Sequence, residues 1–137
     1  MKNGRFLIYL VSITVALVMS GCASKQAYEG EKLPAEQVAL IKSSIHPFGT
    51  SASITSIDGE KGMTWTSGEV EALPGDHELE VSLQSGVYMF YSFAKAKVSF
   101  TAKAGHVYRV EGKIHKKKVW AWIIDEGDNS VVGGEKP

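Results

Sequence analysis

The sequence predicts an all-β domain, which we expect to be a small antiparallel sandwich or barrel of about seven strands. Apolar and polar residues alternate along several short segments, as they do in strands that bury one face. Turn-forming pairs such as Asp58-Gly59 and Ala104-Gly105 separate these segments at intervals of roughly 8–12 residues, a spacing typical of these folds. Hydrophobic residues make up 44% of the chain, enough for the core of one domain.

The predicted domain begins with a short helix or turn. Pro34 is favoured at a first helical position, and we expect an extended segment to follow as far as Ile45. The β-branched residues at positions 53–57 predict the next strand, and Asp58-Gly59 predicts a tight turn after it. A short strand is expected over residues 69–73.

The clearest alternation runs over residues 77–84. Leu79, Val81 and Leu83 share one face of this predicted strand, and polar residues share the other. A period of two with one apolar face predicts a half-buried strand.

Residues 87–93 are apolar at nearly every position, which predicts a centrally buried strand or one whose outer face is covered. Tyr91 and Phe93 share one face of it, opposite Tyr88 and Phe90. A face that the rest of the chain leaves uncovered would be an interaction surface.

Further strands are expected over residues 94–102, 106–114 and 119–125, with a last edge strand at 131–132. Tyr108 should bury its ring while its hydroxyl finds a backbone partner.

The first 21 residues predict a cleaved secretory leader. Lys2 and Arg5 give it a cationic start, and residues 6–18 form its apolar middle. A permanent membrane span needs ~20 apolar residues, so this stretch is short for one, although residues 19–23 could extend it into an uncleaved anchor.

Met19-Ser20-Gly21-Cys22 closes this stretch and resembles the lipobox of bacterial lipoproteins. In that family the cysteine thiol is acylated and the leader is removed just before it. The resemblance therefore implies membrane attachment through acyl chains on Cys22, since two or more chains anchor a protein stably. Cys22 is the only cysteine, which excludes an internal disulfide.

The same resemblance implies a location and divides the chain. Ala23 stands where an aspartate resembles an inner-membrane retention signal in Gram-negative lipoproteins. A Gram-negative host would thus carry this protein on the periplasmic side of its outer membrane. We expect a signal peptide at 1–21, a lipidated tether at 22–33, the β-domain at 34–132 and a frayed tail at 133–137.

Charge argues against a nucleic-acid partner. The chain has 15 basic and 15 acidic residues, and removal of Lys2 and Arg5 with the leader lowers the basic count by two. The mature chain is therefore slightly acidic and lacks the basic excess that nucleic-acid binding requires.

Two stretches resemble a second family. Residues 73–81, Leu-Pro-Gly-Asp-His-Glu-Leu-Glu-Val, resemble a turn and strand of PEGA-like domains, which are small extracytoplasmic β-sandwiches of bacterial surface proteins. Residues 104–110, Ala-Gly-His-Val-Tyr-Arg-Val, resemble a later strand in small lipoproteins of this build. The resemblance implies a fold and a compartment, and no substrate.

The main concentration of charge is the predicted turn at residues 115–118. A candidate surface for an anionic polymer or phosphate head groups consists of Lys116, Lys117, Lys118 and Trp120. The alternative is a basic hairpin tip that deters edge-to-edge association. A sugar-stacking platform is a further alternative, although strand aromatics are more often core; its members would be Trp65, Tyr88, Tyr91, Trp120 and Trp122.

The sequence shows no catalytic motif. The histidines, at positions 46, 77, 106 and 115, lack metal-type spacing, although His77 and His106 could meet in space with Asp76. The carboxylate pairs at 69 and 71 and at 78 and 80 predict solvated strand faces. We expect no metal, no cofactor and no enzymatic activity, while a small hydrolase with a spatially assembled site remains a third alternative.

These observations favour a non-catalytic, lipid-anchored envelope component that docks to another envelope protein near the membrane. The alternative is a module that binds envelope glycan or an anionic polymer.

Overall fold

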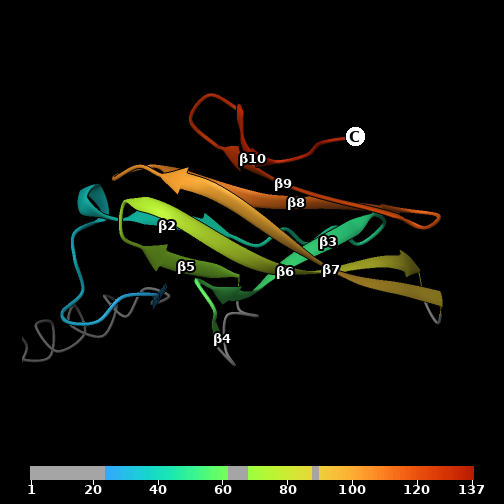
Figure 1. The fold of residues 1–137 in the computed structure, drawn as a ribbon, viewed down its shortest axis with the longest axis horizontal. Helices are drawn as coiled ribbons and strands as arrows, with labels where there is room; N and C mark the ends of the chain where they lie inside the picture. The colour runs from blue at the N-terminus through green and yellow to red at the C-terminus, as the bar shows by residue number, and fades with distance from the viewer. Residues whose placement is uncertain (1–23, 62–67, 88–89) are drawn as a thin grey trace, which may run out of the picture.

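The computed structural model describes residues 24–61, 68–87 and 90–137 (Figure 1). Its regular structure is almost entirely β-strand, arranged in two sheets, so the all-β prediction is confirmed. The leader expected at 1–21, the predicted lipidation site Cys22, and the aromatic residues Trp65 and Tyr88 lie outside the described residues. Within the described part, no helix is long and apolar enough to cross a membrane.

One sheet has six strands in the order β1-β5-β2-β8-β9-β10, and the other has four in the order β4-β3-β6-β7. The elements are β1 (Lys25–Gln26), the 3-10 helix η1 (Ala35–Gln37), β2 (Ala39–Lys42), β3 (Thr50–Ile57), β4 (Glu60–Lys61), β5 (Glu69–Ala72), β6 (Gly75–Val87), β7 (Phe90–Ala102), β8 (Val107–His115), β9 (Lys118–Asp125) and β10 (Val131–Gly134). The described residues thus hold ten strands where about seven were expected, because two-residue strands such as β1 and β4 are too short to show alternation.

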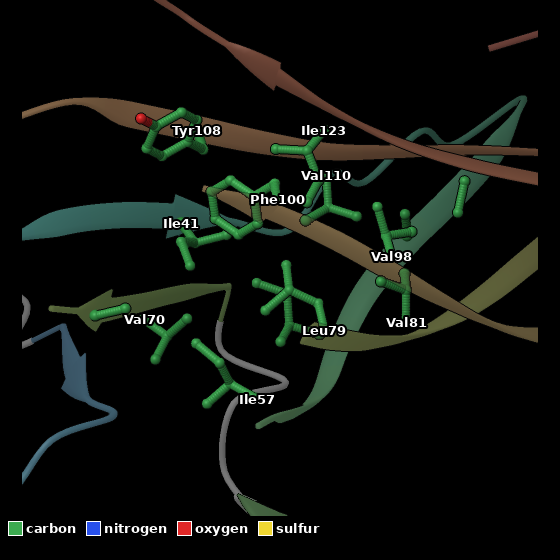
Figure 2. Packing of buried hydrophobic residues seen from close by; sticks show 14 of the residues in the cluster. Ile41, Ile57, Val70, Leu79, Val81, Val98, Phe100, Tyr108, Val110 and Ile123 are labelled. Atoms are coloured by element: carbon green, nitrogen blue, oxygen red, sulfur yellow. The ribbon is translucent and has the colours of Figure 1, made fainter. Parts of the chain in front are cut away.

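The core lies between the two sheets (Figure 2). The predicted inner face of β6 is confirmed, since Leu79, Val81 and Leu83 are fully buried there. From the other sheet, Tyr108 packs edge-on against Phe100, with 5.0 Å between the ring centroids. The Tyr108 hydroxyl accepts a hydrogen bond from the Lys103 amide at 2.9 Å, as predicted for a buried tyrosine.

The two sheets contact each other along both long sides of the sandwich. On one side the Thr50 hydroxyl of β3 accepts a hydrogen bond from the Ile114 amide of β8. On the other side β10 approaches β7 so closely that a Cβ atom on Gly133 would lie 2.5 Å from the Ser99 carbonyl oxygen. Glycine permits this approach, and β10 therefore extends to Gly134, into the stretch expected to be a frayed tail.

The apolar run at residues 87–93 departs from its prediction. Its described residues, 87 and 90–93, belong to the β6–β7 hairpin. Phe90, Tyr91 and Phe93 are exposed there, so the expectation of a buried or covered strand is wrong for these residues. The physical reason is hairpin length. The last pair between β3 and β6 is Thr50 with Ser85, whereas β6 and β7 continue to pair with each other beyond it.

The segment expected to be a tether at 22–33 is partly paired in the structure. Lys25 and Gln26 form β1, which runs parallel to β5. The Ala27 amide then donates to the Glu71 carbonyl at 2.7 Å. The described part of this segment therefore adds an edge to the six-stranded sheet.

Candidate docking surface

Three connections meet at one end of the sandwich, which we call the distal end: residues 43–49 between β2 and β3, the β6–β7 tip (84–87 and 90–93), and the β8–β9 turn at 115–118. The pairing of Thr50 with Ser85 and the hydrogen bond from Ile114 to Thr50 hold them together. Figure 1 shows the β6–β7 and β8–β9 hairpins pointing the same way along the long axis. The short blue strand β1 lies toward the opposite end.

The distal end exposes large apolar side chains from two of these connections. Their exposed fractions range from 48% to 90%; the residues are Ile45, Phe48, Phe90, Tyr91 and Phe93. Tyr91 and Phe93 lie on the outer face of their sheet, 6.1 Å apart between ring centroids. They share a face as the sequence predicted. Since apolar surface is costly to leave in water, so much of it at one end marks a surface that meets something.

A hollow of about 360 Å³ lies where the two apolar connections meet. Ile45 and Tyr91 contribute to its walls, and the remainder is largely polar or backbone, including Ser51, Ser53 and Gln84. His46 also lines the hollow, and its Nε2 lies 2.9 Å from the Glu111 carboxylate. The hollow can hold a small side chain or water at the base of the exposed aromatics.

The predicted basic turn is at the distal end. Lys116, Lys117 and Lys118 are all exposed, and Lys116 adopts a left-handed backbone with φ of 56°. Lys113 is exposed on the adjoining stretch of β8. None of these four lysines makes an ion pair with any described residue.

The tryptophans contribute less to this surface than the sequence allowed. Trp120 and Trp122 lie on the outer face of β9, because the alternate residues Ala121 and Ile123 face the core. Trp122 is nevertheless buried, with 8% of its surface exposed, and Trp120 is half-buried opposite Lys113. Of the two described tryptophans, Trp120 adjoins the basic turn and is the more accessible.

The two histidines expected to meet, His77 and His106, have separate partners and are not brought together. His77 has Nδ1 2.6 Å from Asp58 and Nε2 2.6 Å from the Leu73 carbonyl, which can only accept a hydrogen bond. His106 has Nδ1 2.6 Å from Asp125. Asp76, the expected third member, instead accepts from the Thr101 hydroxyl.

Asp58 anchors the far end of β3. It lies in the predicted tight turn, where Asp58 and Gly59 both have positive φ. Its carboxylate receives hydrogen bonds from His77 and from the Glu78 amide. Burial opposes ionisation of Asp58, but these hydrogen bonds outweigh it and lower its pKa below the ordinary 3.8.

Glu71 is the residue whose role sequence reasoning missed, since it was expected on a solvated face. It is buried, and its carboxylate accepts from the Ser24 and Tyr28 hydroxyls and pairs with Lys32 at 3.2 Å. Burial opposes its ionisation, but the hydrogen bonds from Ser24 and Lys32 outweigh it and lower its pKa below 4.5. No local signal reveals this, because its partners lie more than 35 residues away.

The described residues form no cluster of metal-binding side chains. Across residues 24–61, 68–87 and 90–137, no three His, Cys, Asp or Glu side chains gather as an ion would require. What the described surface offers is a polar, internally hydrogen-bonded end and an apolar, basic distal end.

Comparison with protein-family models, with curated proteins and with solved structures finds no match to this chain. The lipobox and PEGA-like resemblances therefore stay predictions.

Proposed function

We propose that this protein is a lipid-anchored, non-catalytic component of a bacterial cell envelope that docks to another envelope component through its distal end. The observation that carries the proposal is the group of exposed apolar side chains at that end, led by Phe48 and Phe90. Docking requires accessible apolar surface on a folded support, and the distal end offers both.

The opposite end supports the anchoring part of the proposal. Cys22 precedes Ser24 by two residues, so at ~3.8 Å per residue their Cα atoms are at most about 8 Å apart. Ser24 is held by Glu71, whose other partners fix the chain as far as Lys32. Acyl chains on Cys22 would thus emerge close to the folded sheet and hold the domain at the bilayer by its β1 end. Anchoring raises the effective concentration of the distal end for a nearby partner.

Replacement of Cys22 by serine tests the anchoring. The expected result in cells is loss of lipid labelling and accumulation of a precursor that keeps its leader. Radiolabelled fatty acid and the electrophoretic mobility of the protein measure both. Undiminished lipid labelling of Cys22→Ser would sink the lipoprotein assignment.

Site-specific photo-crosslinking in cells tests the docking. A photoreactive amino acid at Phe93 should give a reproducible adduct with one envelope component, whereas the same probe at Val131, an exposed position away from the distal end, should not. Mass spectrometry of the adduct names the component. Equal adducts from both positions, or none from Phe93, would count against docking through the distal end.

A glycan-binding module is the alternative, and the structure gives it weaker support. A sugar platform needs an accessible flat ring beside hydrogen-bonding groups, and Trp122 is buried while Trp120 is half-buried. Recovery of cell-wall fragments, instead of protein or lipid, from the Phe93 crosslink would favour this alternative.

A further inference from the structure

We propose that the distal end docks to an anionic lipid bilayer: its aromatic side chains enter the boundary between head groups and acyl chains, while its lysines contact lipid phosphates. This inference deepens the proposed function by naming what the distal end meets: a membrane surface that faces the one holding the β1 end, since the two ends lie at opposite ends of the long axis (Figure 1). It does not depend on acylation of Cys22, so it can be tested on a form without the anchor.

The shape of the apolar surface favours a lipid partner. Phe48 and Phe90 are 90% and 86% exposed, and they project from separate connections rather than lining a groove. The hollow beside Tyr91 does not include Phe48, Phe90 or Phe93 in its walls. Convex apolar tips fit poorly into a rigid protein surface without a matching pocket, whereas a bilayer yields around them.

The positive charge of the distal end favours an anionic lipid. Lys113 and the three turn lysines are exposed at the distal end and make no ion pair with described residues, although the whole chain is formally neutral. The nearby carboxylate Glu111 is already engaged, by Arg109 at 2.7 Å and by His46 at 2.9 Å. The distal end is therefore locally cationic and complements anionic head groups. Long lysine stems can lie along the apolar surface while the ammonium groups reach phosphate.

A protein strand added to the free edge of β7 is less favoured by the same observations. Among the described strands, β7 pairs only with β6. However, Lys95 and Lys97 follow directly after the aromatic residues on this strand, and edge lysines deter strand addition. They are also held over the sheet face by Glu80 and Glu78, at 3.3 and 3.0 Å.

The test uses residues 22–137 with Cys22→Ser. All residues of the core cluster lie between Ala39 and Ile123, so this form keeps the entire core. Sedimentation measures its partition onto vesicles of phosphatidylcholine alone and onto vesicles of equimolar phosphatidylcholine and phosphatidylglycerol. We expect binding at least about tenfold tighter to the anionic vesicles, weakened by salt because surface charges are screened.

Matched variants locate the binding on the molecule. Lys117→Gln with Lys118→Gln should weaken partition roughly 20-fold or more, since each lysine contributes ~1 kcal/mol near an anionic surface. Lys61→Gln with Lys103→Gln, two exposed lysines at the opposite end of the sandwich, removes the same charge and should have little effect.

The apolar part has its own pair of variants. Phe90→Ser with Phe93→Ser should weaken partition more than about tenfold, and Leu73→Ser at an exposed position on the opposite end should not. Melting curves confirm that each variant is folded.

The outcomes separate this inference from the proposed function. Equal partition onto both vesicle types, or equal effects of distal and control variants, overturns the lipid assignment. Absence of vesicle binding together with a protein adduct at Phe93 also overturns it, while docking through the distal end stands with a protein partner. Absence of both overturns the two together.

Discussion

The end of the sandwich that carries β1 and the distal end differ in the hydrogen bonding of their charged groups and in the solvent exposure of their apolar groups. At the end that carries β1, the carboxylates of Asp58, Glu71 and Asp125 each meet a hydrogen-bonding group from another part of the chain. At the distal end, aromatic rings face solvent, and the lysines of the β8–β9 turn make no ion pair with described residues.

The difference separates stability from docking. Glu71 and Asp125 are buried, and a buried carboxylate contributes to the fold only when its partners are in place, so the β1 end is constrained by the native structure. An exposed phenylalanine contributes little to folding and leaves apolar surface in water. The residues of the distal end should therefore tolerate substitution without loss of the fold, whereas those of the β1 end should not.

The largest expected effect comes from placing a charge in the core. Val81→Asp puts a carboxylate at a position with no solvent exposure, and an unpaired buried charge costs about 3–5 kcal/mol, enough to unfold a marginally stable domain. Phe93→Asp introduces the same charge at the distal end and should leave the melting temperature nearly unchanged. Thermal unfolding followed by circular dichroism measures both. A similar fall in melting temperature for the two variants would contradict the proposed difference between the core and the distal end.

A smaller effect is expected where β10 meets β7. Gly133→Ala would place a methyl group 2.5 Å from the Ser99 carbonyl oxygen, so the strands must separate at a cost of about 1–3 kcal/mol. Gly49→Ala, in the β2–β3 connection at the distal end, meets only the His46 side chain at 3.3 Å and should cost less. Urea denaturation gives the two free energies of unfolding. A neutral Gly133→Ala would show that β10 is loosely held.

Alternation along the chain correctly predicted which residues face the core. It placed Leu79, Val81 and Leu83 together, and turn chemistry placed Asp58-Gly59 between two strands. Both signals are local: a period of two assigns faces, and positive φ favours glycine and aspartate.

What alternation cannot show is whether another layer covers a face. The apolar run at 87–93 has the composition of a buried strand, yet its described residues lie beyond the pair of Thr50 with Ser85, where β3 begins. Glu71 shows the opposite case: it was expected to be solvated, but Ser24 and Lys32, which are far away in the sequence, bind its carboxylate. Coverage and long-range partners are properties of the tertiary structure, and the exposed surface that carries the docking proposal is one of them.

Glu71 predicts a pH effect confined to the end near β1. Its folded pKa lies below 4.5, so its stabilising contribution is complete above that value and is lost as the pH falls through the folded pKa. Glu71→Gln should mimic the acid state and loosen residues 24–32 at a cost of about 1–2 kcal/mol. Hydrogen exchange at the Ala27 amide measures this loosening above and below pH 4.5. Glu69→Gln, at an exposed neighbouring position, is the control. Equal exchange at the Ala27 amide in both variants would contradict the role of Glu71 in holding residues 24–32.

The smallest effect is a gain in stability at the distal end. Lys116 has a φ of 56° in the β8–β9 turn, a backbone conformation that glycine adopts without the steric cost of a Cβ atom. Lys116→Gly should therefore stabilise the fold by up to about 1 kcal/mol, because relief of strain outweighs the added freedom of the unfolded chain. Lys117→Gly, at a neighbour without positive φ, should destabilise slightly. If Lys116→Gly is stabilising and also weakens vesicle binding, the lysine is kept at a strained position at the expense of stability, as a residue retained for docking would be.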